Sequence, residues 1–505
     1  MIHLDVGGLA RAVLLRSLLF AKKGYDVSIL TIEADKNYDY ISEELRKRKD
    51  LPESVEIINI YNYYRDQNTK KSFIKKGIQK FKYYSKAVRI QEYGYSVIDE
   101  YETKKQARYL RLKKYLMFKK WRAGGSLAHI DYFNENGSLK KRLSYVHGLV
   151  TKETLFEAGK TRQKKHYTSD GFCYLIELYN NNVKKNLIFL FSRTNKVITF
   201  NNDKEFHKHF ITELCKKCDD KPYLICDGSG PSPMISNIEP EVAYRISQLH
   251  SNPYEKPYKF GSSIRKIGIL EGIGKEDAFV TLTKKQNLDI KREFGDGGNH
   301  FVIPNFLMDE NKLLEKNPNK ISIFIRFSPE KNLEDAVKAF QIVSEKRDHA
   351  SLEIFGRALL PNEKKELKKI KNLIKKLNLE NKIHIKGHSL NVYEEMSESL
   401  ATILTSKFEG FGMVIIESML NRTPVISYDI NYGPEDIIDH DVNGFLVENG
   451  NIEQMAEYII ELLDNPEKAK TMGIAARKKV LENYSSDIVL KKWEDLFEKI
   501  SNNQN

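Results

Sequence analysis

The sequence predicts an α/β protein with two parallel-sheet domains in tandem and an antiparallel β-rich domain inserted into the first. Three observations lead to this fold class. Short apolar strands alternate with amphipathic helices near both ends of the chain. Between about residues 73 and 204 the helical period disappears, and aromatic or β-branched residues alternate with charged ones. The length of 505 residues suits about three domains.

The first parallel-sheet domain begins with the end of a strand, a glycine turn at Gly7-Gly8 and a helix that runs to about Lys23. Met1 stands only a few residues before this turn, so that we expect either a start further upstream or a stunted first strand. Further strands are expected at residues 27–32 and 55–60 and, after the insertion, in segments that begin at residues 223, 278 and 302. This order of strands and helices is typical of a parallel sheet.

The inserted segment is interpreted as a meander of antiparallel strands. Aromatic or β-branched residues alternate with charged ones at residues 109–112, 129–133, 172–179, 187–191 and 196–200. Turn signals such as Asn134-Glu-Asn-Gly137 separate these runs. Pairs of lysines, among them Lys113-Lys114 and Lys140-Lys141, make the segment basic.

The second parallel-sheet domain follows, with long amphipathic helices between its strands. Its strands are expected at residues 321–326, 351–355, 383–385, 401–405 and 424–428. A last helix, from Tyr484 to about Ile500, carries Trp493. Two such domains in tandem commonly direct the carboxyl ends of their strands toward one crevice, where nucleotides bind.

The chain carries 82 Lys and Arg against 69 Asp and Glu, which gives a net charge of +13. This excess indicates either an anionic partner (nucleic acid, a lipid headgroup or another polyanion) or merely a lysine-rich composition. Apolar residues make up 41% of the chain, which excludes wholesale disorder. No apolar run approaches the ~20 residues of a membrane helix, and Asp5 and Arg16 make the N-terminus a poor signal peptide. We therefore expect a soluble cytoplasmic protein.

Cysteine and acidic motifs do not predict a metal site. The chain has four cysteines, too few for a disulfide scaffold: Cys173, Cys215, Cys218 and Cys226. Cys215-Lys-Lys-Cys218 has the spacing of half a zinc site, but no second pair completes it. Asp439-His-Asp441 is interpreted as a surface turn ahead of Gly444. We expect ordinary reduced thiols, no metal ion and no other cofactor.

Glycines and cations at strand ends are suited to bind a diphosphate. At Gly7-Gly8, the absent side chains would let phosphate oxygens reach backbone N–H groups at a helix N-terminus. Arg326 ends a strand and Lys331 follows five residues later, so that an Arg fork and a Lys point charge could hold a leaving diphosphate. A purely solvated pair is unattractive there, because cations oppose the positive end of the helix that follows.

The strongest signal is the segment Glu409-Gly-Phe-Gly-Met-Val-Ile-Ile-Glu417. Glu409 follows a buried strand, and Gly410-Phe-Gly412 makes a tight turn. The helix from about Met413 then points free N–H groups into the crevice. Glu417 lies one turn inside that helix and can meet a ribose diol with both oxygens. Two carboxylates around a glycine turn have no evident packing purpose, which favours a functional role.

Two further polar segments close strands of the first domain. Asp227-Gly-Ser-Gly-Pro231 follows one strand, and His250 follows the next. A lone His near strand ends is often structural, whereas its position at the same crevice favours function. Both roles stay open for His250.

These motifs together resemble the large family of retaining glycosyltransferases of GT-B fold. The resemblance rests on Gly7-Gly8, Arg326 with Lys331, the Glu-x7-Glu of Glu409 and Glu417, Tyr432-Gly-Pro-Glu, Asn443-Gly-Phe-Leu-Val and the helix from Tyr484 to Trp493. It covers residues 1–72 and 205–500. The inserted segment is similar to that of wall teichoic acid α-glycosyltransferases acting on poly(glycerol-phosphate) or poly(ribitol-phosphate), in which it mediates trimer formation. Bacterial enzymes that glycosylate serine-rich or Ser-Asp-repeat surface proteins share this plan.

The resemblance implies a set of domains. Residues 1–72 and 205–306 would form an N-terminal Rossmann-like acceptor domain, with 73–204 as the inserted β-rich oligomerisation and acceptor domain. Residues 307–480 would form the C-terminal Rossmann-like domain that binds the nucleotide-sugar, and 481–505 a crossover helix and tail.

The resemblance also implies the roles of individual residues. Gly7 or Gly8 matches the diphosphate-contact glycine, and His250 the first-domain histidine at the sugar. The implied catalytic residues are Glu409, which orients the transferred sugar, with Lys331, Arg326 and His250. Of the implied donor-binding residues, Glu417 is the ribose ligand and His388-Ser389 form the loop at the base. The full implied donor-binding set is Gly7, Gly8, Arg326, Lys331, His388, Ser389, Glu409, Gly410, Phe411, Gly412, Met413, Val414 and Glu417. The short first strand and Gly356-Arg-Ala-Leu, which lacks the second glycine of the commoner Gly-x-Gly, depart from the family pattern.

We therefore expect a retaining, metal-independent hexosyltransferase that moves glucose or N-acetylglucosamine from a UDP-sugar onto wall teichoic acid. One alternative is O-glycosylation of a serine-rich or Ser-Asp-repeat surface protein, which is also acidic, so that charge does not separate the two. Another is an inactive polyanion-binding scaffold, which the intact Glu409, Glu417, Arg326 and Lys331 disfavour. The expected partners are the UDP-sugar donor, the anionic acceptor and further copies of the chain in a trimer. No nucleic-acid partner is expected. The expected location is the inner face of the membrane. The sequence does not distinguish the two sugars, because a few contacts around the sugar C2 position decide between them.

Overall fold

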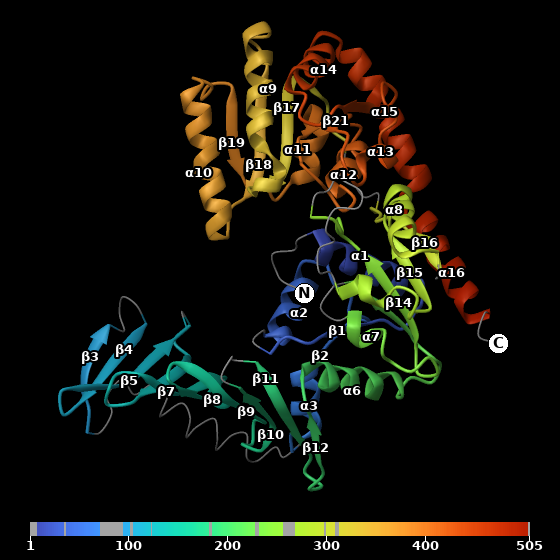
Figure 1. Ribbon diagram of the computed structural model, residues 1–505. Helices are drawn as coiled ribbons and strands as arrows, with labels where there is room; N and C mark the ends of the chain where they lie inside the picture. Colours follow the sequence, from blue (N-terminus) through green and yellow to red (C-terminus); the bar gives the residue numbers. More distant parts are fainter. Residues whose placement is uncertain are drawn as a thin grey trace. The chain divides into compact units, whose positions relative to one another are not determined.

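The computed structural model describes residues 8–34, 37–70, 94–100, 105–122, 124–180, 184–227, 232–255, 268–296, 299–308 and 313–502. Gly7, the strand expected before it and residues 228–231 lie outside these ranges. The chain forms two compact units (Figure 1). Unit 1 comprises Met1–Val27, Glu43–Val55 and Cys218–Asn505, and unit 2 comprises Ser28–Ser42 and Glu56–Lys217. The domain boundaries expected from the sequence stay predictions.

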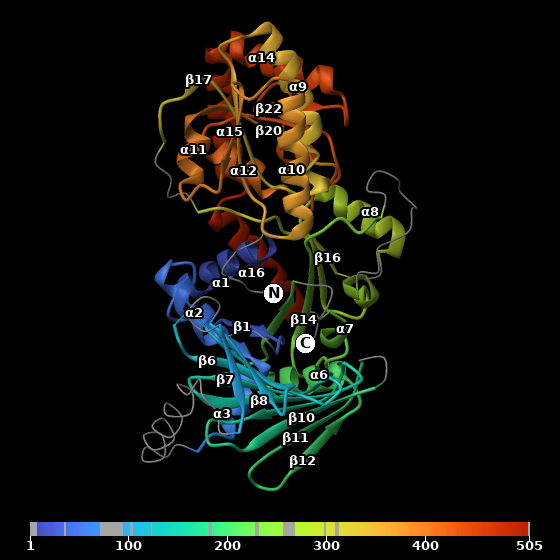
Figure 2. The same ribbon diagram turned by 90° about the vertical axis from the view of Figure 1, so that its left-hand side faces the viewer.

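Unit 1 contains a parallel sheet of four strands: β13 (Tyr223–Cys226), β14 (Tyr244–Leu249), β15 (Ala278–Thr281) and β16 (His300–Val302). On one face, Phe20 of α1 (Gly8–Lys22) and Trp493 of α16 (Ser486–Asn502) pack with Ile246 and Val280 of the sheet. Figures 1 and 2 both show the last helix of the chain running beside α1. The opposite face is covered by α8 (Lys284–Phe294) and the 3₁₀ helix η1 (Gly268–Gly272), and a short α7 (Ser232–Ile235) precedes β14.

A second parallel sheet of unit 1 has the order β19-β18-β17-β20-β21-β22. Its strands are β17 (Asn317–Arg326), β18 (Ser351–Arg357), β19 (Ile383–Gly387), β20 (Ser399–Leu404), β21 (Val425–Tyr428) and β22 (Gly444–Val447). Its helices are α9 (Leu333–Lys346), α10 (Pro361–Lys376), α11 (Val392–Glu398), α12 (Met413–Leu420), α13 (Pro434–Ile437), α14 (Ile452–Asp464) and α15 (Pro466–Asn483). Both faces are covered: Ile321 and Ile323 belong to the core with α9 and α14, whereas Phe324 stacks on Phe355 beside Met396 of α11. Burial on both faces explains the nearly continuous apolar runs of these strands.

Unit 2 is dominated by an antiparallel sheet of ten strands, each paired with the next along the chain. They are β3 (Ser96–Glu100), β4 (Gln106–Arg111), β5 (Lys114–Trp121), β6 (Leu127–Phe133), β7 (Leu139–Val146), β8 (Leu149–Glu157), β9 (Lys160–Tyr167), β10 (Cys173–Tyr179), β11 (Lys185–Phe191) and β12 (Val197–Phe200). This sheet confirms the antiparallel insertion predicted from the sequence. Helix α6 (Asp203–Cys215) follows it.

The strands expected at residues 27–32 and 55–60 are present as β1 (Ser28–Thr31) and β2 (Glu56–Asn59), with α2 (Tyr38–Lys47) between them. In the described part of the chain they pair in parallel with each other and not with β13–β16, and they belong to unit 2. The expectation that they extend the sheet of the first domain is therefore not met there.

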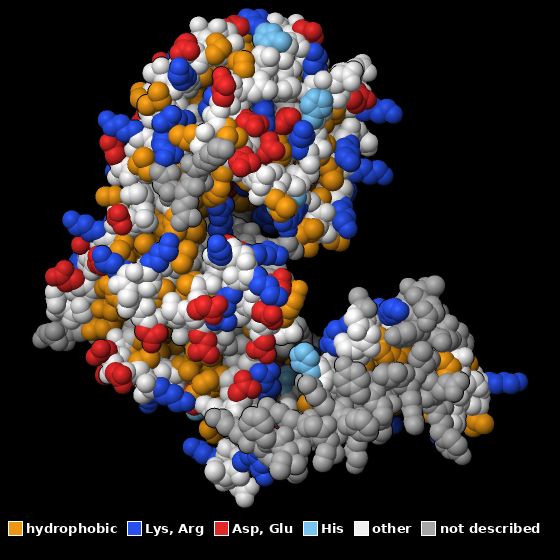
Figure 3. Space-filling model, turned by 180° about the vertical axis from the view of Figure 1, so that it is seen from behind, with side chains coloured by type: hydrophobic (Ala, Val, Ile, Leu, Met, Phe, Trp, Pro, Cys, Tyr) orange, Lys and Arg blue, Asp and Glu red, His pale blue; other side chains and the backbone are white. Residues whose placement is uncertain are grey.

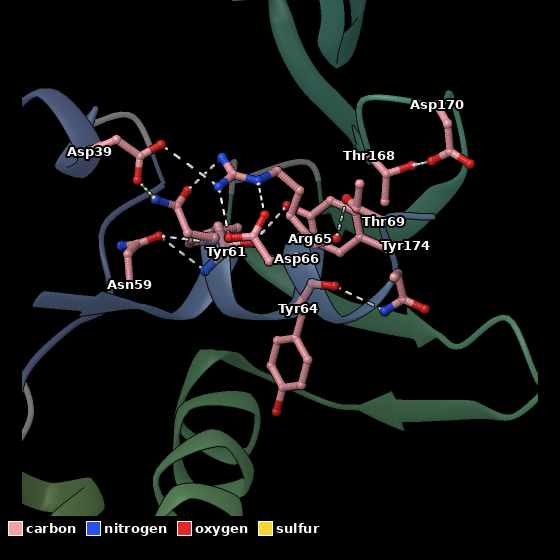
Figure 4. Close-up of polar contacts among 12 residues, drawn as sticks. Asp39, Asn59, Tyr61, Tyr64, Arg65, Asp66, Thr69, Thr168, Asp170 and Tyr174 are labelled. Carbon is pink, nitrogen blue, oxygen red and sulfur yellow. Dashed lines mark hydrogen bonds and ion pairs between the residues drawn. The ribbon is translucent and has the colours of Figure 1, made fainter. Parts of the chain in front are cut away.

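A helix, α3 (Ile60–Gln67), follows β2 directly and was not expected from the sequence. Asn59 starts it, because the Asn59 side chain accepts hydrogen bonds from the N–H groups of Tyr61 and Asn62 at 3.0 and 3.3 Å (Figure 4). Tyr64 of α3 stacks on Phe206 of α6, and the Tyr61 hydroxyl donates to Glu177 of β10 at 3.0 Å. These contacts tie β1 and β2, through α3, to the large sheet rather than to β13–β16.

The surface of unit 1 is basic without being uniformly so. Figure 3 shows Lys and Arg side chains interspersed with Asp and Glu on the face in view. Helix α10 alone exposes seven lysines: Lys364, Lys365, Lys368, Lys369, Lys371, Lys375 and Lys376. The positive charge is therefore not confined to the insertion. Over the ranges that the structure describes, no helix combines the length and apolar character needed to cross a membrane.

Candidate active site

Lys331 and Glu409 form an ion pair at the carboxyl ends of two neighbouring strands of unit 1. Lys331 Nζ lies 2.5 Å from Glu409 Oε1, and the side chains are 17% and 14% exposed. The Ser406 hydroxyl donates to the same carboxylate oxygen at 2.8 Å. The loops after β17 and β20 are tied by a backbone hydrogen bond from Lys407 N–H to Glu330 O at 2.8 Å. The sequence placed both residues at strand ends, and the structure shows that they meet.

The loop that carries Glu409 is held by close backbone contacts. Glu409 N–H donates to Asn431 O at 3.1 Å, and Tyr432 N–H donates to Glu409 O at 3.0 Å. A Cβ at Gly410 would lie 1.9 Å from His250 O. Only glycine permits this approach, which brings the loop against the end of β14. The glycine turn therefore has a packing reason in addition to the functional one inferred from the sequence.

Glu417 lies on α12, with 6% of its surface exposed, and meets a residue that the sequence analysis did not single out. Arg11, in the first turn of α1, donates from Nη1 to Glu417 Oε1 and from Nη2 to the hydroxyl of Tyr393 on α11. Attraction to Glu417 raises the pKa of Arg11, and burial raises the pKa of Tyr393. Three helices therefore contribute to one polar cluster.

His250 belongs to a buried charged cluster at the end of β14. Its Nε2 lies 2.8 Å from Asp227 Oδ1, and Arg16 of α1 donates to both oxygens of Asp227 and to Gln248. Burial alone would raise the pKa of Asp227, but the Arg16 charge and hydrogen bonds from His250 and Arg16 hold it well below its usual range. This carboxylate occupies Nε2 of His250, and among the described residues Nδ1 has no hydrogen-bond partner and could therefore meet a ligand.

Arg326 is the most exposed member of the predicted cationic set. Its side chain is 61% exposed and lies 3.7 Å from Glu330 and 3.9 Å from Glu363. These contacts are long and are made from a largely exposed guanidinium, so that they hold Arg326 weakly. Arg326 is therefore placed at the strand end as predicted and can turn toward an anion.

The other predicted donor-binding positions differ in what they can offer a ligand. Helix α12 begins after Gly412, whose φ of +85° marks a left-handed cap and which, as a glycine, has no side chain to cap the first N–H groups. Phe411 is 3% exposed and packs edge-on against Tyr484, so that only its backbone is suited to meet a donor. Met413 and Val414 pack partly against the same core.

At Gly8, neither packing nor backbone conformation requires a glycine, because a Cβ there would meet no described atom within 4 Å. Gly7 lies outside the described residues. In the loop after β19, the exposed His388 contacts Arg357, and the Ser389 hydroxyl accepts a hydrogen bond from Asn391 N–H at 3.0 Å. A Cβ at Gly356 would lie 2.2 Å from Ile325 O, so that this glycine is required by strand packing.

The described residues that could hold a metal do not cluster. Within the ranges that the structure describes, no three His, Cys, Asp or Glu side chains form a group that could bind a metal ion. None of the four cysteines, all of which lie in described ranges, forms a disulfide. Asp439 and Asp441 lie in the turn before β22, where they pair with Lys479 at 2.5 Å and Lys468 at 2.6 Å. These contacts agree with the interpretation of Asp439-His-Asp441 as a surface turn.

The structure thus joins some predicted residues and adds others. It joins Lys331 to Glu409 and places the backbone of His250 against Gly410. It adds Arg11, Arg16 and Tyr393, which sequence reasoning missed. For Arg11 a signal existed, because a cation in the first turn of a helix opposes the helix dipole and needs a partner.

Comparisons with known proteins indicate the class of enzyme to which the chain is similar. Residues 307–479 match the family described as "Glycosyl transferases group 1". A poly(ribitol-phosphate) alpha-N-acetylglucosaminyltransferase of Staphylococcus aureus (strain COL) is 28% identical over 98% of this chain and 98% of its own. A poly(glycerol-phosphate) alpha-glucosyltransferase of Bacillus subtilis (strain 168) is 25% identical over 97% of this chain and 72% of its own.

A solved structure is similar over the same span. The crystal structure of a mutant of S. aureus TarM in complex with Fondaparinux, alpha-GlcNAc-glycerol and UDP gives a TM-score of 0.84 at 26% identity, over 98% of both chains. This similarity confirms the predicted GT-B fold with its insertion.

Proposed function

We propose that this chain is a retaining enzyme that glycosylates wall teichoic acid. Its residues 307–479 match the group 1 glycosyl transferases, and its fold is GT-B. It would transfer glucose or N-acetylglucosamine from a UDP-sugar to hydroxyls of the polymer. The observation that carries this proposal is the pair Lys331–Glu409 beside the open N-terminus of α12. Relatives similar over nearly the whole chain, named for poly(ribitol-phosphate) and poly(glycerol-phosphate), support the choice of acceptor.

Lys331 and Glu409 would bind different parts of the donor. The free N–H groups at the start of α12 and the ammonium of Lys331 are suited to take the charge of the diphosphate. Glu409, held by Lys331 and Ser406, keeps one oxygen for hydroxyls of the sugar. Arg326 can turn to the leaving phosphate because its present contacts are long and exposed. These groups would stabilise the charge that develops as the donor breaks.

The reaction breaks the bond between the anomeric carbon and the β-phosphate oxygen of UDP. A hydroxyl oxygen of the acceptor forms the new bond to that carbon, and its proton passes to the departing phosphate. UDP leaves with the bonding electron pair. Retention follows if both events occur on one face of the sugar, and the word "alpha" in the names of both relatives supports it. The cationic set supports metal independence, because it already supplies the positive charge that a metal would bring.

The acceptor, the assembly and the location belong to the same proposal. Paired lysines on the large sheet of unit 2 suit a polymer of phosphates, and the net charge of +13 would attract it. Both edges of that sheet, β3 and β12, are suited to pair with neighbouring copies, which supports a trimer. The reaction would take place in the cytoplasm, at the inner face of the membrane.

Incubation with UDP-glucose and with UDP-N-acetylglucosamine tests this function. Each donor is combined with glycerol-phosphate polymer, ribitol-phosphate polymer or a Ser-Asp-repeat protein, and the product is read by mass spectrometry and by proton NMR of the anomeric linkage. Transfer of an α-linked sugar to either polymer supports the proposal. Transfer to the protein alone would establish the alternative acceptor, and binding of polymer without transfer of either sugar would point to the scaffold.

A further inference from the structure

Arg11 occupies a position in unit 1 that the proposed reaction does not explain. It stands in the first turn of α1, three residues after Gly8, and its guanidinium reaches α12 and α11 at once. Nη1 donates to Glu417 Oε1, and Nη2 donates to the Tyr393 hydroxyl. The guanidinium carbon also lies 5.6 Å from the centre of the Tyr393 ring. Two fixed contacts determine the orientation of the guanidinium plane.

Charge and burial make Glu417 dependent on Arg11. The Glu417 side chain is 9% exposed, whereas that of Arg11 is 35% exposed. A carboxylate buried to this extent needs an ionic partner. Among the described residues, Arg11 is the donor that contacts its carboxylate, and it does so at Oε1 alone. The second oxygen, Oε2, is thereby left to accept hydrogen bonds from a ligand.

We propose that Arg11 is a positioning residue of the donor site, which fixes Glu417 so that the carboxylate can bind the ribose of the nucleotide. This inference rests on the proposed function. Arg11 turns Oε2 of Glu417 to the ribose hydroxyls and offsets a negative charge that would otherwise repel the diphosphate. Tyr393 holds the guanidinium in the plane that this contact needs. The reactive groups of the sugar are met by other residues, so that Arg11 acts on binding rather than on the chemical step.

The alternative is that Arg11 merely ties α1 to α12. A tie would affect thermal stability and leave nucleotide affinity unchanged once the protein is folded. A positioning residue changes the affinity for UDP and the KM for the UDP-sugar while kcat stays nearly constant. The two roles are therefore separable by measurement.

The test uses Arg11→Ala and Arg11→Lys in the full chain, with Arg347→Ala as the matched control. Arg347 also pairs with a carboxylate of unit 1, Asp464, and contacts none of the proposed donor-binding residues in the described structure. Calorimetry gives the Kd for UDP, and steady-state assays give kcat and KM for the UDP-sugar. We expect Arg11→Ala to raise Kd and KM about tenfold or more, as the loss of a charged hydrogen bond does, with kcat within about threefold. Arg11→Lys should recover part of the affinity, and Arg347→Ala should change neither constant.

Two further variants protect the test against misfolding. Tyr393→Phe removes only the hydroxyl and should raise Kd by a smaller factor without loss of fold. In a Glu417→Ala background, Arg11→Ala should have little further effect on Kd, because the two residues act as a unit. Unchanged Kd in folded Arg11→Ala would overturn the inference in favour of a structural tie. If the wild-type chain itself fails to bind UDP, the proposed function falls, and this inference falls with it.

Discussion

Lys331 and Glu409 each provide the opposite charge that the other needs in a mostly buried site. Both side chains are mostly buried, and a buried charge that loses its partner keeps its desolvation cost. Ser406 also donates to Glu409, so that this carboxylate retains a partner when Lys331 is removed. Among the described residues, Glu409 is the carboxylate that Lys331 contacts. The two residues are therefore coupled in stability as well as in the proposed catalysis.

Lys331→Ala should lower turnover by about 10²-fold or more, because a cationic contact to the developing diphosphate is lost. Glu409→Ala should lower it by a similar factor, because the transferred sugar loses the charged hydrogen bond that orients it. Far-UV circular dichroism should stay unchanged, while the Tm falls by a few degrees. Arg347→Ala, which breaks an exposed pair with Asp464, is the control for the loss of an ion pair as such. Near-normal turnover in either site variant would refute the assignment.

Transfer should also survive an excess of EDTA. Lys331, Arg326 and the N-terminus of α12 would, in the proposed reaction, supply the positive charge that a metal otherwise brings. The rate is measured before and after chelation and again with added Mg²⁺ or Mn²⁺. A rate that disappears with EDTA and returns with metal would show that the site has been misread.

Gly410→Ala should destabilise unit 1, because the new Cβ would lie 1.9 Å from His250 O and backbone must shift. Gly124→Ala is the matched control, since a Cβ at position 124 would meet no described atom within 4 Å. Thermal unfolding followed by circular dichroism compares the two variants. Equal Tm values would mean that the close approach of the loop to β14 does not occur.

At the scale of elements, β14 and β15 bury an acidic group between them. Glu276 precedes β15, is 9% exposed and accepts a hydrogen bond from Ser247 of β14 at 3.1 Å through Oε1. In the described structure its Oε2 is buried without a hydrogen-bond partner. Burial raises the pKa of Glu276 to about 7. The carboxyl is thus protonated in the folded chain at pH values at which it ionises in the unfolded chain.

The pKa of Glu276 predicts a pH dependence of stability. The folded state holds the proton of Glu276 more tightly than the unfolded state does. The contribution of Glu276 to the free energy of unfolding is therefore fully present below about pH 4.5 and is lost as the pH rises through about 7. Glu276→Gln cannot ionise, so that its advantage over the wild type should grow by on the order of 3 kcal/mol between pH 5 and 8. Denaturant unfolding of both proteins at the two pH values measures this difference. A constant difference would contradict the raised pKa.

At the scale of the whole molecule, the sheet of unit 2 presents an exposed apolar tip. Leu112 lies in the turn between β4 and β5, is 90% exposed and has a φ of +51°. A bulky apolar residue is costly in this left-handed conformation and gains nothing from water. Its presence there is understandable if another copy of the chain covers it, and we therefore propose that this turn takes part in the assembly.

Leu112→Asn should therefore shift the assembly toward monomer, because it removes the apolar contact while asparagine suits the left-handed turn. Static light scattering measures the mass. Val442→Asn replaces another apolar residue, 58% exposed and located in unit 1, and should leave the mass unchanged. If Leu112→Asn keeps the wild-type mass, the tip does not mediate assembly.

Contacts of the site between residues close together in the sequence can be predicted from it, and contacts between distant residues cannot. Glu409 and Glu417 lie in one segment, so that turn chemistry and helix period are sufficient to place both. Arg11 and Glu417 are 406 positions apart, and no local pattern relates them. The same holds for Gly410, whose need for glycine arises from His250.

The sequence by itself determined the two parallel sheets, the antiparallel insertion and the strand ends that carry Lys331 and Glu409. It could do so because apolar period, glycine turns and helix signals are local properties of the backbone. Only the tertiary structure decided that β1 and β2 join the large sheet's unit, that Arg11 holds Glu417, and that Asp227 and Arg16 fix His250. Such pairings depend on which distant segments pack together, and packing is settled by the whole fold.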